Sequence, residues 1–148
     1  MIALAGCGWL PPDSPPAQPV PPDPDAALFH DWKVTEHVLG PRALISESDA
    51  AAFHGRSVAI SATSYASPWS GGCDDAHRQK RSRTLADVTT ELGIARDRTA
   101  TLGLADPVIE YQLTCGLGGT SRTPPLILYV SGTHGLTCGG GVCYALTR

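Results

Sequence analysis

Five cysteines carry the clearest chemistry of this chain, because thiols pair with one another, bind metals or accept lipids. Cys7 stands alone near the N-terminus, and the other four lie much further along. In an oxidising compartment those four would form two disulfides, for which three pairings exist. Cys138 and Cys143 flank the glycine loop of a predicted hairpin, and a bridge between them leaves Cys73 to pair with Cys115. The other pairings stay open.

Metal and catalytic sites are weaker interpretations of the same chemistry. His134 near Cys138 and Cys143 would supply three of four zinc ligands, but no fourth ligand follows at a recognisable spacing. No Gly-x-Ser-x-Gly nucleophile motif accompanies the five histidines, and no phosphate loop or dinucleotide fingerprint is present. We therefore expect no metal, no cofactor and no enzymatic activity.

One short segment concentrates positive charge. Arg78, Lys80, Arg81 and Arg83 lie close together in a chain of formal net charge −3. Such a run either engages an acidic protein, an anionic glycan or lipid headgroups, or coats a solvated loop or edge strand. Trp69, in a turn-rich stretch, is the aromatic residue that we expect to be exposed for contact. These five residues are the predicted partner-binding surface, and the acidic balance argues against nucleic acid.

The residues Leu4-Ala5-Gly6-Cys7 resemble the lipobox of bacterial lipoproteins. In that family the precursor is cut before the cysteine, which receives a lipid. The resemblance thus implies a lipid on Cys7 and makes residues 1–6 the remnant of a signal peptide. Eight prolines in residues 11–24 predict a solvated, semi-rigid spacer, so residues 7–26 form a lipidated tether. The alternative is a short disordered tail with an incidental cysteine.

Residues 27–148 are expected to form a single β-rich domain. Glycine and proline together make up 29 of the 148 residues (16 + 13), which favours turns and short strands over long helices. Alternating or β-branched segments predict strands at residues 32–38, 56–62, 108–115, 126–130, 136–138 and 142–146.

The remaining segments predict turns and two short helices. Ser46 and Thr84 are candidate N-caps, with Gly55 and Gly93 as stop signals, and residues 70–73 are predicted to be a turn. Together the segments indicate a mainly β fold: a small antiparallel barrel or sandwich of about six to eight strands with two short helices.

The lipobox, the proline-rich tether and a small β domain with two disulfides together resemble small proteobacterial periplasmic lipoproteins. The resemblance implies a lipid-anchored protein of the cell envelope. Gly8 rather than an aspartate follows the cysteine, which implies the outer membrane, facing the periplasm.

By analogy with lipoprotein inhibitors of lysozyme and related enzymes, our leading hypothesis is a binding module for an envelope protein or glycan. Its most specific form is an inhibitor or immunity protein against a peptidoglycan hydrolase. The alternatives are a structural accessory lipoprotein of an outer-membrane assembly and an enzyme that acts on the cell wall.

Overall fold

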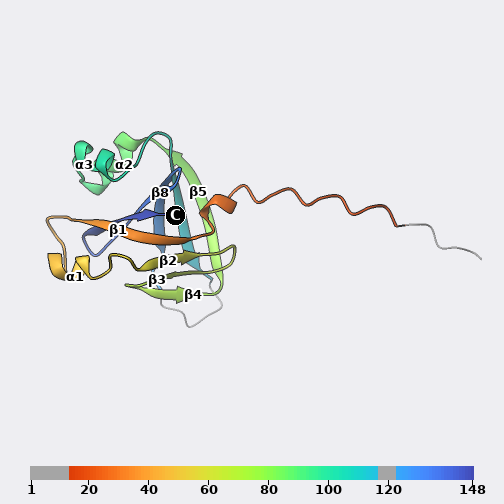
Figure 1. Ribbon diagram of the computed structural model, residues 1–148, viewed down its shortest axis with the longest axis horizontal. Coiled ribbons are helices and arrows are strands. Elements are labelled where there is room, and N and C mark those ends of the chain that lie inside the picture. Colours follow the sequence, from red (N-terminus) through yellow and green to blue (C-terminus); the bar gives the residue numbers. More distant parts are fainter. Residues whose placement is uncertain (1–13, 117–122) are drawn as a thin grey trace, which may run out of the picture.

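A computed structural model describes residues 14–116 and 123–148 of the chain (Figure 1). Cys7, the predicted lipidation site, lies outside the described residues. The described part is mainly β, with nine antiparallel strands in one nearly closed, barrel-like sheet and three short α-helices. The predicted fold class is confirmed, with a strand count slightly above the expected six to eight. Among the described residues, no helix has the length and apolar character needed to cross a membrane.

The elements follow one another along the chain with short connections. The strands are β1 (Asp31–Leu39), β2 (Ser57–Ile60), β3 (Tyr65–Ser67), β4 (Gly71–Cys73), β5 (Ala76–Arg83), β6 (Val108–Cys115), β7 (Leu126–Ser131), β8 (His134–Gly139) and β9 (Val142–Thr147). The helical elements are the 3-10 turn η1 (Ala26–Leu28), α1 (Glu47–Ala51), α2 (Leu85–Leu92) and α3 (Arg96–Thr101).

The sheet has the order β4-β3-β2-β1-β9-β8-β7-β6-β5 and every pairing is antiparallel. Neighbouring strands are therefore consecutive in the chain except β1 and β9, which close the meander. By this alternation the two edge strands, β4 and β5, run in the same direction, and only residues 74–75 separate them. They form two halves of one bent strand, which accounts for the additional strand.

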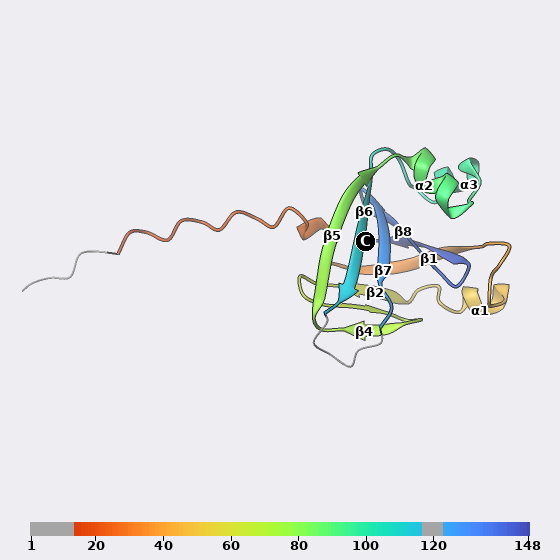
Figure 2. The same cartoon turned by 180° about the vertical axis from the view of Figure 1, so that it is seen from behind.

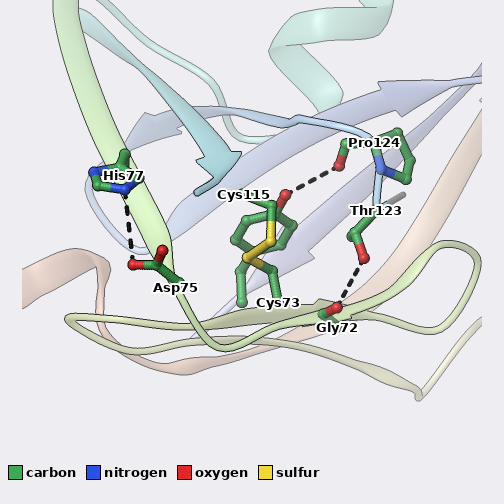
Figure 3. The surroundings of a disulfide bond; sticks show 8 residues. Gly72, Cys73, Asp75, His77, Cys115, Thr123 and Pro124 are labelled. Carbon is green, nitrogen blue, oxygen red and sulfur yellow. Dashed lines mark hydrogen bonds and ion pairs between the residues drawn. A yellow bond between two sulfur atoms is a disulfide. The ribbon is translucent and has the colours of Figure 1, made fainter. Parts of the chain in front are cut away.

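Disulfides join the predicted cysteines. Cys73 on β4 pairs with Cys115 on β6, and this bridge spans the seam between the two edges of the sheet (Figure 3). Cys138 pairs with Cys143, its register partner across the β8–β9 hairpin. These are the two pairings expected from the sequence if Cys138 and Cys143 form the bridge of the final hairpin.

Local capping explains where the short helices begin. Ser46 and Thr84 each accept a hydrogen bond from the backbone N–H three residues later, so the predicted N-caps of α1 and α2 are confirmed. Gly93 ends α2 with φ 67°, a left-handed conformation that suits glycine. The predicted turn at residues 70–73 is wrong, because Gly71–Cys73 pairs with β3 as strand β4.

Alternation along the last strands divides the core into two clusters. Tyr144 and Leu146 of β9 point into the barrel with Trp32 of β1, which is fully buried. Cys143 and Ala145 point outward into a second cluster beneath α2 and the segment that follows α3. Strand β9 is thus buried on both faces, between the barrel core and the helical layer. Figure 2 shows α2 and α3 next to each other on one side of the sheet.

Candidate functional site

The predicted basic surface lies on β5, an edge strand, which is one of the two placements considered for it. The register with β6 pairs Arg78 with Leu113 and Lys80 with Tyr111, whose side chains belong to the barrel core. Arg81 is paired with Glu110, on the opposite face of the sheet. Strand alternation therefore sends the four cations to two different faces.

On the inner face the cations close around one carboxylate. Asp25, only 7% exposed, accepts hydrogen bonds from Arg78 Nε (2.9 Å), Lys80 Nζ (2.6 Å) and the Tyr111 hydroxyl (3.3 Å). Burial alone would raise the pKa of Asp25, but the hydrogen bonds and charges of Lys80 and Arg78 outweigh it and hold this pKa below its usual range. We call these four residues the tether-end clamp.

On the outer face the other two cations are also paired. Arg81 contacts Glu110 at 2.9 Å, and Arg83 bridges Glu110 and Glu91, each at 2.5 Å. With Asp23, which Arg78 contacts at 3.4 Å, four carboxylates face four cations. The excess positive charge that suggested a partner site is therefore neutralised within the fold, and the role of these cations in partner binding stays a prediction.

Trp69 has a different environment from the cations. It lies between β3 and β4, half-buried where the sequence suggested an exposed side chain. Its indole stacks on Tyr144, with ring centroids 4.4 Å apart and planes 14° from parallel. The Phe53 ring stands edge-on to both, 5.6 Å from Trp69 and 5.7 Å from Tyr144. Sequence reasoning missed Phe53 and Tyr144 because their chain positions give no sign of this cluster.

This aromatic cluster lines a hollow of about 600 Å³ at one end of the barrel. We call it the mouth. Its lining is mostly apolar and has no charged side chain, and it includes Leu44, Ile45, Phe53, Trp69, Leu126 and Tyr144. Sites for small ligands and inserted side chains usually occupy roughly 300–1,000 Å³, so this volume suits a binding function.

Two strands diverge at the mouth, which is why a hollow forms there. The β7–β8 ladder ends at the pair Leu128 and Thr137, whereas β8 continues to Gly139 beside β9. Thr137 Oγ1 donates to the carbonyl oxygen of Ile127 at 2.7 Å, beside the last pair of the ladder. Ile127, Thr137 and the residues after Thr137 on β8 all line the mouth.

Two hydrogen-bonding groups of residues that line the mouth have no partner. Within residues 14–116 and 123–148, neither the Tyr144 hydroxyl nor the Trp69 Nε1–H makes a hydrogen bond, although Tyr144 is only 3% exposed. Every fully buried polar side-chain atom in this part of the chain is bonded, so these two groups are accessible. Burial raises the pKa of Tyr144, which keeps its hydroxyl protonated and able to donate.

The mouth lies away from the N-terminal tether. Residues 14–23 leave the barrel as an extended segment, and the chain then enters β1 at Asp31. Leu44 and Ile45 of the mouth follow the other end of that strand, Leu39. Figure 1 shows the extended segment on one side of the barrel and α1 on the other. The mouth thus lies beyond the opposite end of β1 from this extended segment.

A second polar cluster was not predicted. His37 Nδ1 and His54 Nε2 are 2.8 Å apart, and His37 Nε2 forms a short contact with Glu47. The chain of hydrogen bonds connects β1 to α1 and to the segment after it, and none of the three residues lines the mouth. Among the described residues, no three His, Cys, Asp or Glu side chains form a group that could hold a metal ion.

Comparisons with protein-family models, with curated proteins and with solved structures find no match for this chain.

Proposed function

We propose that the protein is a binding module of the bacterial cell envelope, held to the membrane by a lipid on Cys7, that engages an envelope partner through the mouth. The observation that carries the proposal is the uncharged hollow of about 600 Å³ with its two unpartnered donors on Trp69 and Tyr144. Exposed apolar surface of this kind is costly in water and commonly marks a binding site.

The most specific form of this proposal is an inhibitor or immunity protein against a peptidoglycan hydrolase. The lipobox resemblance supports a location at the outer membrane, facing the periplasm. The position of the mouth supports binding to such a partner. A partner in the periplasm or on peptidoglycan would meet the end of the barrel that lies opposite the extended N-terminal segment (Figure 1).

The experiment is the clearing of a peptidoglycan suspension by a panel of lysozyme-like hydrolases, with and without the full chain. We expect slower clearing with at least one hydrolase. Trp69→Ala should raise the inhibitory concentration about thirtyfold, because a central tryptophan commonly contributes about 2 kcal/mol to an interface. The matched control is Arg81→Ser, which removes one of the neutralised cations outside the mouth and should inhibit like the wild type.

Each result has a direct meaning. If no hydrolase is slowed, the inhibitor form of the proposal is rejected. If Arg81→Ser abolishes inhibition and Trp69→Ala does not, the partner binds the charged strand and the assignment to the mouth is wrong.

A further inference from the structure

We propose that His37 and His54 form a pH-sensitive switch, which holds the α1 segment and the Phe53 side of the mouth in place until both imidazole rings are protonated. The α1 segment is residues 40–56, between β1 and β2. The inference concerns the regulation of the mouth, so its consequence for binding rests on the proposed function. The switch itself is a change within the chain and is tested without a partner.

The two histidines, which we call the histidine pair, join the α1 segment to the sheet. His37 lies on β1 and His54 follows α1, and the His37 Nδ1 and His54 Nε2 atoms are 2.8 Å apart. His37 Nε2 forms a short contact with the carboxylate of Glu47, the first residue of α1. Among the described residues, the other side-chain hydrogen bonds of α1, those of Ser48 and Asp49, stay within its own N-cap.

The histidine pair is next to the aromatic cluster of the mouth. Phe53 lines the hollow and directly precedes His54 in the chain. The Phe53 ring stands edge-on to Tyr144, 5.7 Å away. Tyr144 on β9 is the register partner of His37, so these two side chains lie on the same face of the sheet. A break between the two histidines would therefore act on Phe53 and Tyr144, two residues that line the mouth.

The geometry of the histidine pair determines how many protons it holds. A neutral imidazole has one N–H and one lone pair, so two ring nitrogens in contact share one proton. With the His37 Nε2–H donating to the Glu47 carboxylate, His37 Nδ1 accepts the His54 Nε2–H. One added proton fits on His54 Nδ1 and leaves both hydrogen bonds in place, because His54 is exposed to water on that side.

A second added proton breaks the contact. It would place N–H against N–H and two positive charges on adjacent rings, and the His37 side chain is only 11% exposed, so water screens this repulsion poorly. The separated form of the pair thus takes up one proton more than the joined form. The ratio of separated to joined molecules therefore rises by up to about tenfold for each pH unit of acidification.

Other charged or titratable groups near the pair do not reproduce this behaviour. Glu47 on α1 offsets the first added proton. Burial raises the pKa of Tyr144 on β9, so its hydroxyl stays neutral in acid. Glu36 lies on the opposite face of β1, by strand alternation, and Arg56 follows the α1 helix. In residues 14–116 and 123–148, neither Glu36 nor Arg56 forms an ion pair with the two rings.

The test follows the isotopically labelled full chain by NMR from about pH 8 to about pH 4.5, the range in which histidine titrates. The ring nitrogens report the protonation of the histidine pair. The nuclear Overhauser effect between the Phe53 and Trp69 rings, which we call the ring contact, reports the mouth. We expect the ring contact to be lost, with a shift of the Trp69 indole N–H, at the pH where the pair takes up its second proton.

Two substitutions of the exposed His54 separate its proton from its hydrogen bond. The amide of His54→Gln donates to His37 but takes up no proton, so the ring contact should persist over the whole range. His54→Ala removes the bond, so the ring contact should be weak already at about pH 8. The matched control is His77→Gln on β5, which replaces a histidine that also faces a carboxylate but lies outside the mouth, and it should respond like the wild type.

The inference is overturned if the ring contact survives to the acid end of the range, or if it is lost in His54→Gln at the same pH as in the wild type. A ring contact that His54→Ala preserves, or a response that His77→Gln removes, also overturns it. None of these results bears on the proposed function, which is tested by the dependence of hydrolase inhibition on Trp69. Conversely, a pH response of the predicted kind in a protein that slows no hydrolase supports the switch and rejects the inhibitor form.

Discussion

The two ends of this barrel differ in how their polar side chains are bonded. At the tether end, Asp25 is buried and its carboxylate is bonded by Arg78, Lys80 and Tyr111. The Trp32 indole N–H also finds a partner there, the carbonyl oxygen of Leu28 at 2.9 Å. At the mouth, the lining is apolar and the polar groups of Trp69 and Tyr144 are left without partners among the described residues.

The comparison shows that a run of positive charge in the sequence does not by itself mark a free surface in this fold. Buried charges require partners within the protein, and the clamp uses its cations for that purpose. An apolar hollow with unpartnered donors has no such internal use, and occupancy by a ligand would both cover the apolar surface and satisfy the donors. Stability should therefore depend on the tether end and binding on the mouth.

The largest loss of unfolding free energy should come from removing the Cys73–Cys115 disulfide, which spans the seam. Cys73 lies just before β5, the strand that carries two clamp cations. The double variant Cys73→Ser/Cys115→Ser releases a loop with a sequence separation of 42 residues, for which chain entropy predicts a loss of about 4 kcal/mol in unfolding free energy.

Its control is Cys138→Ser/Cys143→Ser near the mouth, where a separation of only 5 residues predicts a loss of about 2 kcal/mol. Urea denaturation measures both. Equal losses would show that loop entropy does not govern the seam.

Asp25→Ala should destabilise the fold by removing the carboxylate at the centre of the clamp. It leaves two cations and the Tyr111 hydroxyl without their shared acceptor, and a buried partner of this kind contributes about 2–3 kcal/mol when its neighbours remain partly hydrated. Urea denaturation should show this loss, while the mouth-dependent binding of the folded fraction is retained. An unfolding free energy within about 0.5 kcal/mol of the wild type would mean that the clamp is not a stabilising feature.

Much of the fold could be predicted because local signals and final structure agree. The alternation in residues 32–38 and 108–115 marks β1 and β6, and the caps Ser46 and Thr84 mark two helices. Helix α3 escaped prediction because its N-cap, Ala95, makes no side-chain hydrogen bond. Strand β4 escaped because two of its three residues are glycines, so its pairing with β3 has almost no side-chain pattern.

The candidate site was less predictable because it is made by long-range contacts. Trp69 was singled out as an exposed residue but is half-buried, and its neighbours Phe53 and Tyr144 meet it only after the barrel closes. The sequence does not reveal that the cations of β5 are neutralised, because their partners Asp25 and Glu110 lie far from them in the chain. Ion pairing across a sheet depends on register, which local composition does not determine.

The same chemical change at both ends gives a sharper comparison with a smaller effect. Tyr111→Phe removes a hydroxyl that donates to Asp25 and should cost about 1 kcal/mol, because the bond is long but has a charged acceptor. Tyr144→Phe removes an unpartnered hydroxyl and should change stability by less than about 0.5 kcal/mol. Parallel urea titrations measure the pair, and a larger loss for Tyr144→Phe would contradict the assignment of the two ends.

The smallest effect concerns the pH dependence of the clamp. The pKa of Asp25 is lower in the folded protein than in the unfolded chain, so its ionised form stabilises the fold above the unfolded pKa. That stability is lost as the pH falls through the folded pKa, in the acid range below about 4.

Asp25→Asn is therefore less stable than the wild type at pH 7, and the difference should shrink towards pH 3. Comparing the two proteins at each pH cancels the titration of the other carboxylates, which they share. A difference that stayed constant from pH 7 to pH 3 would show that the clamp holds Asp25 by shape and hydrogen bonds, without a contribution from its charge.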